Sequence, residues 1–415
     1  MLRQKKHIIF FALLTLLLIG KTAEAQPSHK NYEVEARAHY GYLFFQRDKY
    51  HQALRRYEMF APAYEFSVHR NTYGQHRWEV LHNYPSYGLT FYYSGFRNDE
   101  VSKELGKVFA LYPFISFSRI QKGFDKLAIK MGVGLSYFTN KYDPKENWYN
   151  YAIGSHLNLA VNLSVEYRKK ILNRLSSVTT LGLTHFSNGS LCTPNYGINI
   201  LSAATGFSWF LNQPKTPIDK KLRSKLRLFE FDGKRYCFTD VQFTLGYKDM
   251  SQQLGSHDQY FIYNMTGNFL FPVSECDRLG IGIEAIKDNS GKALNEGWDK
   301  EYYFMKAGVM LSYETEFDQI SFLFNLGYRI EDFHFIDEFR KAEKFKDKLK
   351  TIPTQFYQKA SIRYYLSDNL FATFSFTTYD IKADFLSIGI GYRFYHNYHL
   401  STYEKKTKYS PVFPR

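Results

Sequence analysis

Residues 127–137, LAIKMGVGLSY, and residues 157–166, LNLAVNLSVE, decide the fold of this chain. In both segments large apolar residues occupy the odd positions, while the even positions hold small, amide or charged residues. Alternation with a period of two predicts β-strands that have one apolar face and one polar face. The strands are long and their second face resembles a barrel lumen, so we expect the odd-numbered face to contact lipid.

The composition favours a membrane β-barrel over a soluble secreted β-sandwich. The 415 residues include 35 tyrosines and 38 phenylalanines, although the mean hydropathy is negative. Aromatic residues at both membrane interfaces would explain this combination. The net charge of +14 favours anionic lipid headgroups, and export makes nucleic acid an improbable partner. Three cysteines form no disulfide framework or metal motif, and no cofactor is expected.

Residues 1–25 have the features of a secretory signal peptide. Basic residues precede an apolar run from Ile8 to Ile19, and the segment ends in the small-x-small pattern Ala23-Glu24-Ala25. The apolar run is shorter than the roughly 20 residues that a membrane-spanning helix needs. Since no later stretch reaches that length, a membrane protein made from this chain must be a β-barrel. Its expected location is the outer membrane of a bacterial cell.

Strand-like segments continue through the chain, so the expected fold is all-β, a transmembrane antiparallel barrel of about 14 to 16 strands. Residues 26–212 carry the first strands, 213–235 form a basic linker or turn, 236–395 carry further strands, and 396–415 form a tail. The linker could hold phosphorylated headgroups or be a solvated charge run. One large barrel is favoured over two eight-stranded barrels, because a single closed sheet has only one pair of edge strands that must pair with each other.

The side of the membrane on which each connection lies can be counted backward from the last predicted strand, residues 385–395. Its aromatic end at Phe394 resembles the terminal strand that the barrel-assembly machinery recognises. If Phe394 lies in the periplasm, the long connections fall outside, as is usual in bacterial barrels. The loop at residues 188–195 then also faces outward, whereas residues 213–235 are the exception that falls in the periplasm.

Residues 185–199, HFSNGSLCTPNYGIN, lie between two strand-like segments and contain the candidate active site. By parity, His185 and Ser187 share the apolar face of one strand, and Asn199 shares the apolar face of the next. Three polar side chains facing lipid are costly unless they satisfy one another. A hairpin centred near Cys192 would place His185 opposite Asn199, within the reach of opposed side chains.

These residues have the chemical types that an ester hydrolase needs. Ser187 would be the nucleophile, His185 the base, and the side-chain oxygen of Asn199 would orient the imidazole. Donors near Asn188 and Gly189 would stabilise the oxyanion. The alternative interpretation is an ordinary Ser-Asn-Gly-Ser loop with a histidine at the membrane interface.

The segments His185–Gly189 and Pro194–Asn199 resemble the PagL-type lipid A 3-O-deacylases, also called acyloxyacyl hydrolases, and the resemblance covers about residues 32–212. It implies an outer-membrane barrel that hydrolyses the 3-O-linked acyl ester of lipid A, the membrane anchor of lipopolysaccharide. His185 matches the base of the family, Ser187 its nucleophile, and Asn188 a residue at its oxyanion hole. The acidic member of the family site falls at Asn199.

Two alternatives to a lipid A deacylase remain at this stage. Outer-membrane phospholipase A is similar over His-x-Ser-Asn-Gly and orients its histidine with an asparagine at the offset of Asn199. Its calcium-binding positions are not recognisable around residues 190–195. A porin or transporter is the second alternative, in which the motif would have no catalytic role. A pore would place its polar chemistry inside, whereas His185, Ser187 and Asn199 are predicted to face outward.

Overall fold

The computed structural model describes residues 31–45, 54–96, 99–122, 125–212, 235–250, 259–274, 276–291, 304–331, 333, 354–379 and 382–398. The predicted signal peptide, residues 213–234 of the basic linker and the tail beyond residue 398 lie outside the described residues. No helix in these ranges is both long enough and apolar enough to cross a membrane.

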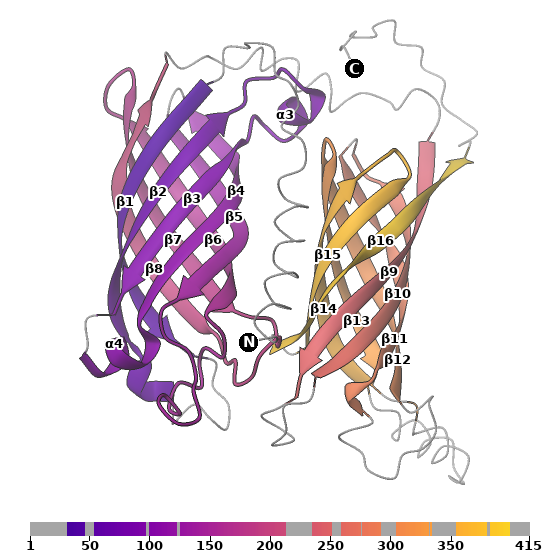
Figure 1. The fold of residues 1–415 in the computed structure, drawn as a ribbon. Helices are drawn as coiled ribbons and strands as arrows, with labels where there is room; N and C mark the ends of the chain where they lie inside the picture. The colour runs from indigo at the N-terminus through magenta and orange to yellow at the C-terminus, as the bar shows by residue number, and fades with distance from the viewer. Residues whose placement is uncertain are drawn as a thin grey trace, which may run out of the picture. The chain divides into compact units, whose positions relative to one another are not determined.

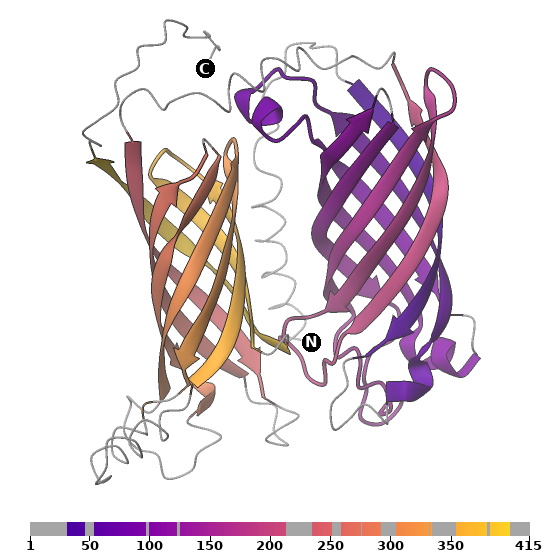
Figure 2. The same ribbon diagram turned by 180° about the vertical axis from the view of Figure 1, so that it is seen from behind.

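Sixteen antiparallel strands, all in the described ranges, form two closed barrels of eight strands each (Figures 1 and 2). The first barrel consists of β1 (Asn31–Phe44), β2 (Met59–Asn71), β3 (Ser86–Gly95), β4 (Lys107–Lys122), β5 (Asp125–Phe138), β6 (Leu157–Lys170), β7 (Leu175–Ser187) and β8 (Ile198–Phe210). The second consists of β9 (Arg235–Asp249), β10 (Gln259–Pro272), β11 (Asp277–Asp288), β12 (Met305–Phe317), β13 (Ile320–Ile330), β14 (Thr354–Tyr365), β15 (Leu370–Tyr379) and β16 (Lys382–Tyr398).

The expected fold class and strand number are confirmed, but the preference for a single barrel is wrong. Strand β1 pairs with β8 from Glu33↔Phe210 to Phe44↔Asn199, which closes the first sheet on itself. Strand β16 pairs with β9 in the same way and extends to Tyr398, into the predicted tail. Eight strands suffice for closure because a barrel of this size has an interior that side chains can fill. Neither barrel therefore retains an unpaired edge.

The predicted alternation of faces is present in both barrels. On β7 and β8 the outer face carries Leu181 and Leu201, which are 60% and 50% exposed, while Thr180 and Ser202 are buried inside. On β5 and β6 the outward residues Met131 and Leu163 are each 50% exposed. The second barrel presents a similar apolar exterior, with exposed large residues that include Ile281, Ile283, Val309 and Leu311. Exposed apolar bands on closed sheets are the surface that lipid covers.

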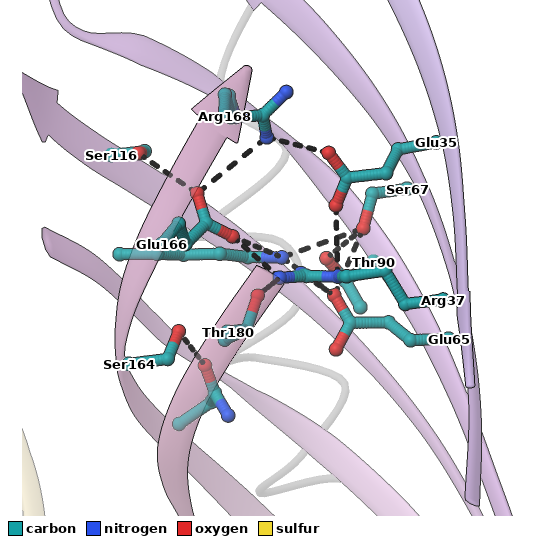
Figure 3. Close-up of polar contacts among 12 residues, drawn as sticks. Glu35, Arg37, Glu65, Ser67, Thr90, Ser116, Ser164, Glu166, Arg168 and Thr180 are labelled. Atoms are coloured by element: carbon teal, nitrogen blue, oxygen red, sulfur yellow. Dashed lines mark hydrogen bonds and ion pairs between the residues drawn. The ribbon is translucent and has the colours of Figure 1, made fainter. Parts of the chain in front are cut away.

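The lumen of the first barrel is filled by a network of paired charges (Figure 3). Arg37 Nη1 donates to Glu166 Oε1 at 2.7 Å and to Thr180 Oγ1 at 2.6 Å, and its other nitrogens pair with Glu35 and Glu65. Lys130 Nζ donates to Glu65 Oε1 at 2.6 Å. These side chains are almost fully buried. In the part of the barrel that the structure describes, this packed layer is inconsistent with a water-filled pore.

The second barrel has a comparable layer of charges. Arg363 Nη1 lies 2.6 Å from Asp240 Oδ2, and Arg393 donates to Asp240 Oδ1 and to Glu314 Oε2, each at 2.7 Å. All four side chains are buried. Each barrel is therefore a packed unit, and neither described lumen supports the porin alternative.

One end of the first barrel carries the connections that surround the candidate site. The β1–β2 and β3–β4 connections contain the short helices η1 (Arg55–Tyr57) and α4 (Asp99–Leu105), and the opposite end carries α3 (Arg77–Leu81). The alternation of apolar residues gave no indication of these helices. A buried apolar cluster lies beneath the connections and includes Leu43, Leu54, Tyr57, Leu105, Phe138, Ile153, Phe186, Ile198 and Ile200. This cluster fixes the strand ends that hold the site.

Candidate active site

The predicted site residues come from the ends of two paired strands. His185 on β7 lies directly opposite Asn199 on β8, and Ser187 is the last residue of β7. Leu183 and Leu201 occupy the next outward positions of the two strands and are exposed. The period of two therefore places His185, Ser187 and Asn199 on the lipid-facing side of the barrel.

The three side chains form a continuous hydrogen-bond chain. His185 Nδ1 lies 2.8 Å from Asn199 Oδ1, and His185 Nε2 lies 3.0 Å from Ser187 Oγ. Asn199 Nδ2 donates to the backbone oxygen of Phe44 on β1 at 3.4 Å, which turns Oδ1 toward the imidazole. The acceptor at Nδ1 favours the tautomer with a proton there and leaves Nε2 free to accept the Ser187 proton.

Asn188 organises the loop that follows Ser187. Its backbone N–H donates to Asn195 Oδ1 at 3.1 Å, and its side-chain nitrogen donates to Cys192 O at 2.9 Å and Ser155 Oγ at 3.0 Å. These donors, predicted for the oxyanion, are engaged within the loop and with Ser155 of the β5–β6 connection. Gly189 follows with φ 62°, a conformation that suits glycine.

The β5–β6 connection supports the site loop from one side. The backbone N–H of Tyr196 donates to Tyr151 O at 3.2 Å, and that of Gly197 donates to Ala152 O at 3.0 Å. A Cβ atom at Gly154 would lie 2.5 Å from Pro194 O, so only glycine permits this close approach. Residues 151–155 could not be assigned a role from the sequence, because pairing between two loops leaves no periodic signal.

Gly197 is a further residue of the site whose role could not be predicted from the sequence. Its φ is 71°, and a Cβ atom would lie 2.8 Å from His185 Cε1 and 3.3 Å from Ser187 Cβ. The signal available in the sequence was a glycine two residues before Asn199, which also fits an ordinary turn. Glycine here allows the imidazole to lie against the backbone.

We expect Gly197→Ala to lower kcat by about 10²-fold, because displacement of His185, the predicted base, removes its productive geometry. Hydrolysis of the predicted ester substrate by the purified variant in detergent measures the effect. Gly267→Ala on β10 is the matched control, since a Cβ atom there meets only Ile283 at 3.7 Å. Full activity of Gly197→Ala would show that the imidazole does not depend on this close approach.

The family comparisons, together with the closed barrel fold, define the class of this protein, an ester hydrolase of the outer membrane. Two family models match the chain. "Lipid A 3-O-deacylase (PagL)" matches residues 63–208, which contain the candidate site, and "Acyloxyacyl hydrolase, C-terminal domain" matches residues 237–397. The chain belongs to the lipid A 3-O-deacylase (PagL) family. It is an outer-membrane lipid A deacylase that is extended by a second barrel.

Comparison with solved structures identified several matches. "Crystal structure of the outer membrane enzyme PagL" matches with 16% identity and a TM-score of 0.29, covering 44% of this chain and 99% of that chain. OccK11 (OpdR) of Pseudomonas aeruginosa matches with 8% identity and a TM-score of 0.22, covering 89% and 96%. OpdO of Pseudomonas aeruginosa matches with 9% identity and a TM-score of 0.23, covering 89% and 97%. A search of curated proteins gave no match.

Proposed function

We propose that Ser187, His185 and Asn199 perform the hydrolysis of the acyl ester of lipid A as a serine esterase. The observation that supports this most directly is the hydrogen-bond chain from Ser187 Oγ through both imidazole nitrogens to Asn199 Oδ1. A serine hydroxyl alone is a weak nucleophile, and an adjacent base activates it. The three residues occupy outward positions of β7 and β8, so an ester in the membrane would approach them without entering the lumen, although Ser187 itself is only 4% exposed.

The reaction has two halves. Ser187 Oγ bonds to the ester carbonyl carbon while its proton passes to His185 Nε2. The bond to the 3-oxygen of lipid A then breaks, and that oxygen leaves with the proton from His185. In the second half His185 takes a proton from water, the hydroxide attacks the acyl-enzyme, and the fatty acid is released as Ser187 regains its proton. Asn199 Oδ1 holds the Nδ1 proton throughout.

Stabilisation of the oxyanion requires N–H donors near Ser187. Because the donors of Asn188 are engaged with Asn195, Cys192 and Ser155, we assign it the role of holding the turn. The sequence predicted oxyanion donors near Asn188 and Gly189. Of these two residues, Gly189 is our candidate, and its backbone N–H would donate to the oxyanion.

The site is proposed to open toward the outer leaflet. The β7–β8 loop shares its end of the barrel with the β1–β2, β3–β4 and β5–β6 connections, and bacterial barrels usually have their long connections outside. Lipopolysaccharide would then approach laterally through the membrane. Residues 1–25 would act as an export signal, and the aromatic residues near Phe394 would be recognised by the barrel-assembly machinery during insertion.

Mass spectrometry of lipids from cells with and without the gene tests the substrate assignment. We expect lipid A to lose one ester-linked acyl chain only when the protein is present, with a matching amount of free fatty acid. Release of lysophospholipid with unchanged lipid A would instead favour the phospholipase alternative. Unchanged profiles of both lipids would contradict an esterase function.

Asn199 is expected to act through its oxygen. Asn199→Ala should lower kcat by about 10²-fold or more, because the imidazole loses the acceptor that fixes its tautomer. Asn199→Asp retains an acceptor at the same position and should stay within about 10-fold of the parent. Steady-state hydrolysis of purified lipid A compares the variants. Equal losses in both would mean that the Asn199 amide nitrogen, bonded to Phe44 O, matters more than its oxygen.

A further inference from the structure

Two aromatic side chains lie next to each other at the surface of the β5–β6 connection. The rings of Trp148 and Tyr149 are in contact, and the two residues are 46% and 43% exposed. Large rings of this kind contribute most to stability when they are buried. Tryptophan, tyrosine and arginine are also the side chains that most often anchor a bound partner. This exposed aromatic pair therefore offers a contact surface for a ligand.

A cation adjoins the aromatic pair. The guanidinium carbon of Arg56 lies 4.4 Å from the centre of the Tyr149 ring and 4.9 Å from the centre of the Tyr57 ring. Arg56 Nη2 donates to Tyr57 Oη at 2.9 Å and pairs with Glu104. Among the residues that the structure describes, these contacts use one nitrogen of a group that has five N–H donors, and the side chain is 40% exposed. Arg56 can therefore bind hydroxyl or phosphate oxygens of a ligand that covers Tyr149.

The backbone that carries the aromatic pair is held over the end of the first barrel. Tyr57 Oη, in the β1–β2 connection, donates to Tyr149 O at 2.9 Å. Asn147 Nδ2 donates at 2.8 Å to the backbone oxygen of Glu104, in the β3–β4 connection. Contacts with both of these connections place residues 147–150 across the barrel end, whereas the aromatic girdle of a membrane barrel lies along its lipid-facing wall. The pair is therefore positioned for the polar part of a membrane lipid.

The same connection is bonded to the loop of the candidate active site. Tyr151 O accepts the backbone N–H of Tyr196 at 3.2 Å, and the next residue, Gly197, lies against the imidazole of His185. Trp148 precedes Tyr151 by three residues, which span at most about 10 Å. Added along this path, these steps keep Trp148 Cα within about 25 Å of the imidazole. A saccharide joined to the ester at Ser187 extends over such a distance.

We propose that Trp148 and Tyr149 stack on a pyranose ring of the substrate saccharide, next to the Arg56 guanidinium. This inference rests on the proposed function, a lipid A esterase whose site opens at the outer leaflet. Lipid A is an acylated and phosphorylated disaccharide, and lipopolysaccharide extends it with further sugars. The C–H face of a sugar ring packs on aromatic rings, while a few polar groups fix its orientation. A glycerophospholipid has no such ring, so this surface would favour glycolipid esters.

Trp148→Ala and Tyr149→Ala test the proposal in mixed micelles. We expect each to raise KM for lipopolysaccharide about 10-fold and to keep kcat within about 3-fold, because a contact made equally in the ground and transition states affects KM alone. Hydrolysis of a p-nitrophenyl fatty ester, which has no saccharide, should stay within about 2-fold of the parent. Trp209→Ala is the matched control, since Trp209 is 43% exposed and lies at the opposite end of the barrel, paired with Leu175. It should retain the parental KM.

A second substrate, lipid A freed of the outer sugars, identifies the ring that is bound. A higher KM for both substrates assigns the contact to the lipid A disaccharide, and a higher KM for lipopolysaccharide alone assigns it to the outer sugars. Parental KM for both in folded variants overturns the inference and leaves the esterase proposal intact. An equal loss with the p-nitrophenyl ester also overturns it, since the pair would then have only a structural role. A parent chain that hydrolyses neither glycolipid contradicts the proposed function itself.

A measurement on the unaltered chain keeps the inference testable if neither variant folds, which heat-modifiable gel migration establishes. The probe is fully deacylated lipopolysaccharide, a soluble saccharide that has no ester to hydrolyse. In a saturation-transfer NMR experiment, irradiation of the aromatic protons of the protein should transfer magnetisation to the ring C–H protons of the probe. Absence of transfer at millimolar probe would overturn the proposal.

Discussion

Replacement of Ser187 by alanine is expected to reduce deacylation of lipid A by at least about 10³-fold while both barrels still fold. The hydroxyl is the end of the hydrogen-bond chain through His185, and its loss removes the atom that would form the acyl-enzyme. Residues that act as one catalytic unit show strongly non-additive effects. Ser187→Ala combined with His185→Ala should therefore be scarcely less active than Ser187→Ala alone.

The measurement is lipid A mass spectrometry in cells that express each variant, followed by rate constants for the purified proteins. Ser177→Ala is a matched control, because Ser177 lies on the same face of β7. Among the residues that the structure describes, its hydroxyl donates a hydrogen bond only to Lys169 O, at 3.5 Å. We expect this control to retain parental activity. A fully active Ser187→Ala chain would show that another group is the nucleophile.

The face of the barrel on which the candidate site lies was predictable, because alternation with a period of two assigns each residue of a strand to one face. Once Leu183 and Leu201 are assigned to lipid, His185 and Asn199 must share that face, and opposite pairing follows from the short hairpin. The resemblance of the motif and the parity of the strands are independent observations that select the same residues. A short, local part of the sequence was therefore enough to predict which residues the structure brings together.

The number of barrels was not predictable in the same way. Closure of the first sheet depends on pairing between β1 and β8, which are far apart in the chain, and alternation says nothing about such partners. The ion pairs in the lumen could not be predicted for the same reason, since Arg37 on β1 bonds to Glu166 on β6, which is also far away in the chain. Likewise the bond from Asn188 to Asn195 depends on the conformation of a loop without periodicity.

The charge layer in the lumen of the first barrel leads to the largest expected effect on stability. Arg37 has buried contacts with Glu35, Glu65 and Glu166, and Thr180 also accepts one of its protons. Removing one member of a buried ionic group leaves uncompensated charges and typically costs about 3–5 kcal/mol. We expect Arg37→Met to lower the free energy of unfolding by about that amount. Urea titration of the full chain in detergent micelles, followed by tryptophan fluorescence, measures it.

The cause of this loss can be separated from a simple packing defect. If uncompensated carboxylates cause it, adding Glu65→Gln to Arg37→Met should recover part of the stability, although a second buried contact is removed. If lost packing causes it, the double variant should be less stable than Arg37→Met. Lys169→Met, on the exposed face of β6, is the matched control and should change stability by less than about 1 kcal/mol. A positive coupling would identify Arg37 as the cation that makes a carboxylate-rich lumen compatible with a closed barrel.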